Sequence, residues 1–341
     1  MQLSLAQQDI IDAPYNKVVV MASAASGKTN LMTEKVRQLL RANVDPRQIV
    51  VITFTNLAAS ELRGRLGDDY KPGLYVGTIH SLANQLLNMA GISTSSILNK
   101  EQFDKLFYLV KKNPHCVKHY DWVLLDEAQD SDENQFEFIF DMINPDCFFV
   151  CGDVKQSIYQ WNGARPKLLK ALARRPNVHS FELLENYRNS IKILNDARRI
   201  IQKSGEVDNS IPMRQIMGVD EWIRLNDDDI IARIEARPPY NQWAILCRWN
   251  KDVDKFSATL TEAGIPHETF KQAGMTKDDM DERMGRDTVK VLTVHGAKGL
   301  EWDNVMVYGT MFSNYRSDDE INISYVAATR ARNCLYWIGK K

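Results

Sequence analysis

The segment VVVMASAASGKTN, residues 18–30, carries the strongest structural signal in this chain of 341 residues. It begins with an apolar, β-branched run, which predicts a buried strand. Small residues follow and lead into Ser26-Gly27-Lys28-Thr29, after which comes a segment long enough for a helix. The backbone amides of such a loop, together with the N-terminus of the next helix, bind phosphate groups. The segment therefore predicts a phosphate-binding loop between a strand and a helix.

The same loop predicts binding of ATP and Mg²⁺. Lys28 is expected to reach the β- and γ-phosphates, and the Thr29 hydroxyl is expected to bind the metal ion. The strict pattern GxxxxGK[ST] is not met, because Ala22 stands where the first glycine belongs. The alternative is an ordinary strand–turn–helix connection that happens to contain GKT. The expected nucleotide contacts in this loop are Ala24, Ala25, Ser26, Gly27, Lys28, Thr29 and Asn30.

A second apolar run, WVLLDEAQD at residues 122–130, ends on two acids. At the carboxyl end of a buried strand these acids would lie beside the phosphate loop if the two strands are neighbours. Asp126 is then expected to hold Mg²⁺, and Glu127 to orient and deprotonate the attacking water. The alternative is a strand that ends in a solvated acidic turn. Pairing with a phosphate loop about 100 residues earlier favours nucleotide hydrolysis.

Strand-like runs alternate with helix-length segments along the whole chain. This alternation predicts βαβ units and mostly parallel sheets, and the apolar strands predict helices on both faces. The runs form one set near residues 20, 52, 124 and 150, and a second set near 183, 246, 292 and 307. We therefore predict two α/β domains with a boundary around residues 176–192. The expected domains are 1–180 and 181–341.

The composition indicates a soluble globular protein, with 44% hydrophobic and 26% charged residues. No apolar run approaches the ~20 residues that a membrane span requires, so we expect no membrane partner. The start of the chain, MQLSLAQQDIID, has the features of neither a signal peptide nor a transit peptide. Five cysteines without a CxxC pair favour a cytoplasmic protein, and the net charge of -1 neither predicts nor excludes a nucleic-acid partner.

Taken in order, the motifs resemble those of the UvrD/PcrA/Rep group of superfamily 1A helicases along nearly the whole chain. The blocks that carry the resemblance are LSLAQQDII, ITFTNLAASELRGRL, GTIHSLA, LLDEAQD, CGDVKQSIYQWNGA, LLENYRN, AILCRWN, TVHGAKGLEW and YVAATRAR. The resemblance implies two RecA-like P-loop NTPase domains, called 1A and 2A. It also implies an ATP-dependent translocase or helicase that moves 3′ to 5′ on single-stranded DNA.

The resemblance assigns further contacts to the nucleotide. It implies that Gln7 reads the adenine, that Tyr187 stacks on the adenine, and that Glu301 contacts the sugar or the γ-phosphate side. Arginines that neutralise the transferring phosphoryl group would come from the second domain. The residues implied to act on the γ-phosphate are Gln156, Arg188 and Arg330.

The resemblance also implies a track for single-stranded DNA. Phe54, His80, Tyr159 and Trp161 match positions that touch or stack on bases. Stacking on aromatic side chains contributes about 1–3 kcal/mol per base and tolerates any sequence, which suits a motor. Packing in the protein core is the alternative for each aromatic residue. The remaining candidates for DNA contacts are Thr55, Asn56, Thr78, Arg248, Thr293 and His295.

The largest departure from the family is the lack of room for its accessory subdomains, 1B and 2B. About 46 residues separate His80 from Asp126, and about 45 separate Arg248 from Thr293. A subdomain of usual size needs at least ~50–100 residues beyond the core connections. We therefore expect short remnants within residues 85–120 and 264–287. Two smaller departures are Asn30, where a basic residue is frequent, and Asn162, where an arginine is usual.

Two functions remain open at this point. The first is an autonomous, monomeric helicase acting on single-stranded DNA or a tailed duplex, and the intact motif set favours it. The second is a DNA-stimulated ATPase switch or motor subunit that needs a protein partner in place of the missing subdomains. A small-molecule kinase with the same phosphate loop has little support, because it leaves the aromatic residues and the paired arginines unexplained.

Overall fold

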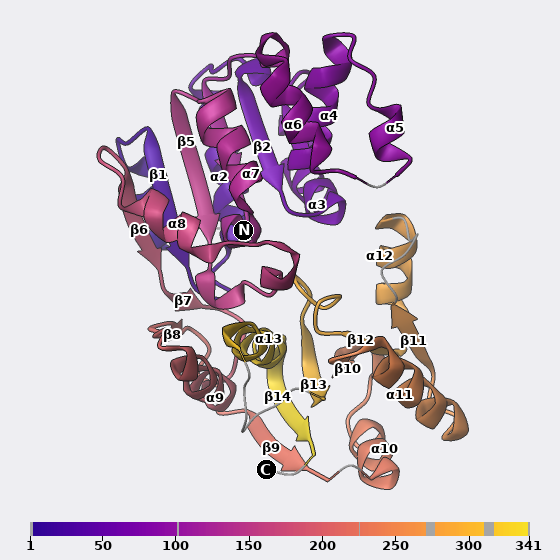
Figure 1. The fold of residues 1–341 in the computed structure, drawn as a ribbon. Coiled ribbons are helices and arrows are strands. Elements are labelled where there is room, and N and C mark those ends of the chain that lie inside the picture. The colour runs from indigo at the N-terminus through magenta and orange to yellow at the C-terminus, as the bar shows by residue number, and fades with distance from the viewer. Residues whose placement is uncertain (1–2, 101, 225, 271–276, 310–316, 340–341) are drawn as a thin grey trace. The chain divides into compact units, whose positions relative to one another are not determined.

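The computed structural model describes residues 3–100, 102–224, 226–270, 277–309 and 317–339. Within this part of the chain, each of two compact units is built on a six-stranded sheet flanked by helices (Figure 1). The strands of both sheets pair in parallel. The predicted fold class, two RecA-like α/β domains with parallel sheets between helices, is confirmed.

The division between the units does not follow the chain order strictly. Most of the first unit precedes Leu184, and most of the second unit follows it. Two short segments that follow strands of the first sheet, Ser23–Ser26 and Lys155–Ile158, group with the second unit. Each segment belongs to one of the predicted motifs, so residues of both motifs are described below with the second unit.

The first sheet has the strand order β3-β2-β4-β5-β1-β6. Its strands are β1 (Lys17–Ala22), β2 (Ile49–Thr53), β3 (Tyr75–Thr78), β4 (Trp122–Leu125), β5 (Cys147–Gly152) and β6 (His179–Leu183). Successive side chains of a strand point to opposite faces, and both faces of this sheet are covered. Val19 packs in a core with Leu82 of a following helix, whereas Val18 and Val20 pack in a second core with Leu31. This double burial explains the near-continuous apolar strands.

The helices of the first unit cover the two faces of its sheet. They are α1 (Leu5–Asp12), α2 (Lys28–Arg41), α3 (Asn56–Leu66), α4 (Ile79–Met89), α5 (Ser95–Leu98), α6 (Lys105–Lys112), α7 (Glu133–Glu137) and α8 (Pro166–Ala173). α1, α2 and α3 supply side chains to the core that contains Val18. α4, α6, α7 and α8 supply side chains to the core that contains Val19.

One strand lies in a different sheet from the one predicted. The run near residue 183 was grouped with the second set of strands, but β6 pairs with β1 in the first sheet, with Val20 opposite Phe181. The strand is at the sheet edge and only Leu183 is fully buried in it. The chain order of strand-like runs does not show which sheet an edge strand joins, and this caused the error.

The second unit contains the sheet β11-β12-β10-β13-β14-β9 and the small pair β7-β8. Its strands are β7 (Glu185–Asn186), β8 (Ile211–Pro212), β9 (Val219–Ile223), β10 (Trp243–Cys247), β11 (His267–Phe270), β12 (Val289–Thr293), β13 (Trp302–Tyr308) and β14 (Ala331–Ile338). Its helices are α9 (Ile191–Ile201), α10 (Asp227–Glu235), α11 (Asn250–Glu262), α12 (Lys277–Gly285) and α13 (Asp318–Ala328). Ser190 is the N-cap residue of α9.

The two intervals expected to hold remnants of accessory subdomains are short in the structure. Within residues 85–120 lie the end of α4, then α5, α6 and a 3-10 turn at Pro114–Cys116. Within residues 264–287 lie β11 and α12, while residues 271–276 are outside the described part. The fully buried Lys290 donates to the carbonyl oxygens of Arg283 and Arg286 and so ties the end of α12 to the sheet. Among the described residues, no helix is both long and apolar enough to cross a membrane.

Candidate active site

The predicted phosphate loop joins β1 to α2. Gly27 precedes the first helical residue, Lys28, and has φ of +84°, a left-handed conformation that glycine adopts without steric cost. Ala25 also has a positive φ, +57°, which is uncommon for a residue with a β-carbon. The Ser26 hydroxyl donates to the Ser23 carbonyl oxygen at 2.8 Å. The loop is therefore held in a tight turn directly before the N-terminus of α2.

Gln7 lies against this loop. Its side chain is buried, and its Oε1 accepts a hydrogen bond from the Ser4 amide at 3.0 Å in the capping box of α1. A β-carbon built on Gly27 would lie 2.6 Å from the Gln7 amide nitrogen. The left-handed conformation therefore favours glycine at position 27, and a side chain there would displace the Gln7 amide group. The residue predicted to read the adenine is next to the predicted phosphate cradle.

The predicted acidic turn follows β4 at the same edge of the sheet. Asp126 is 6% exposed, and Glu127 has φ of +52°, which turns the chain sharply at the end of the strand. The Asp126 carboxylate accepts a hydrogen bond from the Glu127 amide at 2.9 Å. Lys28 Nζ lies 3.8 Å from Glu127 Oε1. The phosphate-loop lysine and the acid predicted to activate water are therefore neighbours, as expected for carboxyl ends of parallel strands.

Gln129 was not predicted as a site residue, although the quoted block LLDEAQD contains it. This fully buried amide donates to Glu127 Oε2 at 2.5 Å and accepts from the Asp153 amide at 2.9 Å. A β-carbon on Gly152 would lie 2.8 Å from Gln129 Oε1, so that glycine leaves room for it. Gln129 fixes the orientation of Glu127 relative to the end of β5. No sequence signal shows this bond, because its partners are on two different strands.

A cavity of about 130 Å³ adjoins the acidic turn within the first unit. Its lining includes Asp126 and Glu127 on one side and Phe54, His80 and Asn162 among the rest. The further acids that line it are Asp104, Asp130 and Asp132. Burial lowers the pKa of His80 although the nearby Asp104 and Asp132 raise it. The cavity is lined by both carboxylates predicted to act in hydrolysis and by two predicted DNA contacts, Phe54 and His80.

The aromatic residues predicted to contact DNA differ in their exposure. Trp161 is 69% exposed and lies on the 3-10 turn Gln160–Asn162. The rings of Phe54 and Tyr159 are tilted against each other, with centroids 4.8 Å apart. His80 packs beside Phe107 at 5.1 Å. The exposed Trp161 and the half-buried Phe54–Tyr159 pair have the character of a surface platform.

The polar candidates on this unit take part in local structure. Thr55 is the N-cap of α3 and accepts from the Ala58 amide, and Thr78 is the N-cap of α4 and accepts from the Ser81 amide. Asn56 is the first residue of α3 and is exposed. Thr55 and Thr78 thus both stand at helix N-termini, and the N-terminus of a helix favours phosphate contacts.

In the second unit, the predicted γ-phosphate residues Gln156 and Arg330 are bonded to each other. Arg330 is 2% exposed, and its Nη2 donates to Gln156 Oε1 at 3.1 Å. Arg330 Nε donates to the Val326 carbonyl oxygen, and Lys298 Nζ donates to the Gln156 carbonyl oxygen. The arginine is therefore held at both ends of its guanidinium group.

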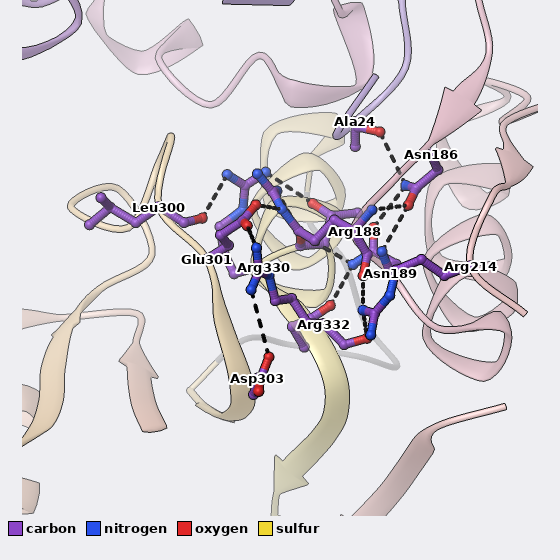
Figure 2. Close-up of polar contacts among 12 residues, drawn as sticks. Ala24, Asn186, Arg188, Asn189, Arg214, Leu300, Glu301, Asp303, Arg330 and Arg332 are labelled. Atoms are coloured by element: carbon purple, nitrogen blue, oxygen red, sulfur yellow. Dashed lines mark hydrogen bonds and ion pairs between the residues drawn. The ribbon is translucent and has the colours of Figure 1, made fainter. Parts of the chain in front are cut away.

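Arg188, the other predicted finger, lies in the same unit beside Glu301 (Figure 2). Its Nε donates to Glu301 Oε2 and its Nη1 donates to the Thr329 carbonyl oxygen at 2.9 Å. Two arginines that were not predicted adjoin this pair. Arg332 forms an ion pair with Glu301, and Arg214 donates to the Arg188 carbonyl oxygen. A sequence hint existed for Arg332, because it follows Arg330 by two residues in YVAATRAR.

The segment Ser23–Ser26 contacts the block LLENYRN. Asn186 Nδ2 donates to the Ala24 carbonyl oxygen at 3.1 Å, and the Tyr187 amide donates to the Ala25 carbonyl oxygen at 3.2 Å (Figure 2). The Tyr187 ring is 42% exposed, and its hydroxyl donates to Glu185. Tyr187, which is predicted to stack on the adenine, thus directly follows Asn186, whose side chain is bonded to the phosphate loop.

The remaining DNA candidates lie near the carboxyl ends of β10 and β12. Thr293 Oγ1 accepts from the Gly296 amide, and the Arg248 guanidinium lies over the Trp249 ring. His295 contacts the Ile158 carbonyl oxygen through Nε2 at 3.1 Å. Burial and the neighbouring Arg248 lower the pKa of His295, which favours the neutral ring at pH 7.

Hard oxygen ligands suit the predicted metal ion. Thr29 lies on the segment that follows β1, and the buried Asp126 lies on the segment that follows β4, with β5 between these two strands. Both offer oxygen, the ligand type that Mg²⁺ prefers. By contrast, a cluster found elsewhere, His119 with Asp121 and Asp146, is largely exposed and its members pair with one another.

Comparison with known proteins gives the same family for both units. The UvrD/REP helicase N-terminal domain matches residues 3–114 and 110–177, and the UvrD-like helicase C-terminal domain matches residues 270–341. A probable DNA helicase of Mycoplasma pneumoniae is 24% identical, over 94% of this chain and 80% of that protein.

Two other relatives are longer than this chain. Gabija protein GajB of Bacillus cereus is 25% identical over 80% of this chain and 65% of its own length. ATP-dependent DNA helicase Rep of Escherichia coli is 24% identical over 78% of this chain and 55% of its own length. The match therefore spans between about half and two thirds of these two proteins.

Proposed function

This chain belongs to the UvrD/Rep helicase family, and on that premise we propose that it uses ATP hydrolysis to move 3′ to 5′ along single-stranded DNA. The main support for the proposal is that Lys28 Nζ and the Glu127 carboxylate lie close together at one edge of the sheet. Gln129 donates a hydrogen bond that orients this carboxylate. A phosphate-binding lysine beside an oriented carboxylate is what hydrolysis of a nucleotide requires.

The hydrolytic roles follow from the chemistry of each group. The loop amides and Lys28 bind the phosphates, and Thr29 and Asp126 hold Mg²⁺, which would neutralise phosphate charge when bound. Glu127 orients the attacking water and accepts its proton. Gln156 contacts the γ-phosphate, and Arg188 and Arg330 stabilise the charge on the transferring phosphoryl group. Gln7 reads the adenine, Tyr187 stacks on it, and Glu301 contacts the sugar or the γ-phosphate side.

The track for DNA follows from the exposed aromatic residues. Bases stack on Phe54, Tyr159 and Trp161, with His80 beside them, and this type of contact does not depend on sequence. Backbone contacts come from the remaining polar candidates, which are Thr55, Asn56, Thr78, Arg248, Thr293 and His295. The cavity shared by Glu127 and Phe54 supports coupling of the DNA track to the hydrolytic acids.

We propose that residues 1–180 and 181–341 act as the motor domains 1A and 2A. Residues 85–120 and 264–287 then replace subdomains 1B and 2B in reduced form. All five cysteines are free thiols, which supports a cytoplasmic protein, and we take it to act as a monomer.

A second candidate function is a DNA-stimulated ATPase that unwinds only with a protein partner. The short intervals around α5 and α12 favour it, because they leave little structure to hold duplex DNA. The partner would supply that surface.

Strand separation with two tailed duplexes tests these alternatives. The purified chain, with ATP and Mg²⁺, is given duplexes that differ only in carrying a 3′ or a 5′ single-stranded tail. Opening of the 3′-tailed duplex alone supports an autonomous helicase of the proposed polarity. Opening of neither, with DNA-stimulated hydrolysis intact, supports the partner-dependent ATPase. Absence of ATP hydrolysis with and without DNA would refute both.

A further inference from the structure

Arg188 is already bonded before it meets any phosphate. Its Nε donates to Glu301 Oε2, and its Nη1 donates to the Thr329 carbonyl oxygen at 2.9 Å. Its side chain is only 12% exposed. To act on a phosphate through the same guanidinium edge, Arg188 must give up its bond to Glu301.

Glu301 is shared by two arginines. Arg332 Nη2 lies 2.5 Å from Glu301 Oε1, the oxygen that Arg188 does not use, and Arg332 Nη1 lies 3.9 Å from Asp303 (Figure 2). The Arg332 side chain is 47% exposed and the Glu301 side chain is 31% exposed. Glu301 therefore has one partner that is deeply buried and one that is largely in solvent.

A bulge in β14 brings Arg332 to this position. Trp302 of β13 pairs with Ala331 of β14, but the next recorded pair is Asn304 with Cys334. Arg332 and Asn333 therefore both stand opposite Asp303, and an extra residue of this kind redirects side chains. Arg214 fixes the bulge by donating to the Arg332 carbonyl oxygen at 3.2 Å and to Asn333 Oδ1 at 2.7 Å.

We propose that Arg332 is a positioning residue for Arg188. By holding Glu301 and balancing its charge, Arg332 allows Arg188 to leave Glu301 for the γ-phosphate of ATP. This inference rests on the proposed function, because it takes Arg188 to act on that phosphate.

The physical reason is the state of Glu301 after Arg188 has moved. A carboxylate that is mostly buried and loses its arginine is destabilised, since it has neither water nor a partner to solvate it fully. Arg332 remains bonded to Oε1 and supplies the missing positive charge. Without Arg332, Glu301 retains Arg188 more strongly, and the γ-phosphate must compete against a tighter ion pair.

The test compares nucleotides with and without a γ-phosphate. Dissociation constants of ADP and of AMP-PNP, both with Mg²⁺ and saturating oligo-dT, are measured for wild type, Arg332→Gln, Arg332→Lys, Glu301→Gln and the double variant Arg332→Gln/Glu301→Gln. DNA-stimulated kcat is measured in parallel. Arg332→Gln should weaken AMP-PNP roughly tenfold and ADP by less than about twofold, since one charge-assisted hydrogen bond is in question. Arg332→Lys should recover most of the loss.

The double variant decides whether Arg332 acts through Glu301. With Glu301→Gln the retaining charge is gone, so adding Arg332→Gln should change AMP-PNP affinity by less than about twofold. Arg233→Gln, which removes a comparably exposed arginine paired with Glu221, should leave all constants unchanged.

Three outcomes would overturn the inference. An equal loss of AMP-PNP affinity in both Glu301 backgrounds would mean that Arg332 touches the phosphate itself. An equal loss for ADP and AMP-PNP, or a thermal unfolding midpoint lowered without recovery by Arg332→Lys, would mean a purely structural role. If the wild-type protein hydrolyses no ATP, the proposed function itself is refuted, and the inference loses its premise.

Discussion

Two polar regions of this molecule have opposite charge balances. At the carboxyl edge of the first sheet, a single lysine, Lys28, lies beside Asp126 and Glu127. In the second unit, Arg188 and Arg332 share the carboxylate of Glu301, and Arg214 donates to the carbonyl oxygens of both arginines (Figure 2). The residues of that second region are Arg188, Arg214, Glu301, Asp303, Arg330 and Arg332.

This difference in charge balance indicates how the two regions divide the proposed reaction. An acid-rich site suits the binding of a metal ion and the activation of water, whereas an arginine-rich site suits the stabilisation of negative phosphoryl charge. Neither charge balance alone supplies both. The proposed roles therefore assign metal binding and water activation to the acid-rich region, and stabilisation of phosphoryl charge to the arginine-rich region.

The largest effect is expected from removal of Lys28 in the acid-rich region. Lys28→Ala should lower ATP turnover by at least about 10²-fold, because a preorganised positive charge is lost from the phosphate cradle. Binding of single-stranded DNA should stay near the wild-type value. Steady-state ATPase assays and DNA titration measure the two effects. Lys71→Ala, an exposed lysine of the same unit, serves as the control. Turnover at the wild-type rate in Lys28→Ala would show that this edge is not the hydrolytic site.

A smaller effect is expected from the amide that orients Glu127. Gln129→Ala should lower kcat about tenfold and leave the KM for ATP nearly unchanged, because a misplaced base slows chemistry and not binding. Steady-state kinetics at saturating DNA separate the two constants. An increase of KM at constant kcat would contradict the proposed role of Gln129 in orienting Glu127.

A third prediction concerns the segment that carries Gln156 and Trp161. Gln156, bonded to Arg330, is five residues before Trp161. Trp161→Ala should weaken single-strand binding by about 1–3 kcal/mol and reduce stimulation of hydrolysis by DNA, while hydrolysis without DNA remains unchanged. Fluorescence anisotropy and ATPase assays with and without oligo-dT report these effects. If DNA stimulates ATP hydrolysis in the variant as strongly as in wild type, Trp161 has a structural role and does not contact DNA.

The first region could be predicted from sequence because its parts are local. The strand, the glycine and the lysine are contiguous in residues 18–28, and the acids end another apolar strand. One rule then brings them together, since the carboxyl ends of parallel strands share an edge. The alternation of strands and helices gave the fold class for the same reason.

The second region could be predicted only in part. Arg188 and Arg330 were assigned from the family resemblance, but Arg332 and Arg214 were missed, because their roles depend on a bulge and on contacts between distant segments. The edge strand β6 was placed in the wrong sheet for a similar reason. Tertiary contacts, unlike strand periodicity, leave no local pattern in the chain.

The bulge in β14 also limits which insertions and deletions the chain can tolerate. Beyond the bulge, Cys334, Tyr336 and Ile338 face a core, and the neighbouring residues face the other side of the sheet. Removal of Arg332 or Asn333 would convert the bulge to regular pairing and leave Cys334 opposite Asn304, so the later side chains would keep their faces. Removal of a residue after Cys334 would instead turn over the side chains that follow it, because the side-chain period of a strand is two. A single-codon deletion should therefore be far more damaging in the strand after Cys334 than at the bulge itself.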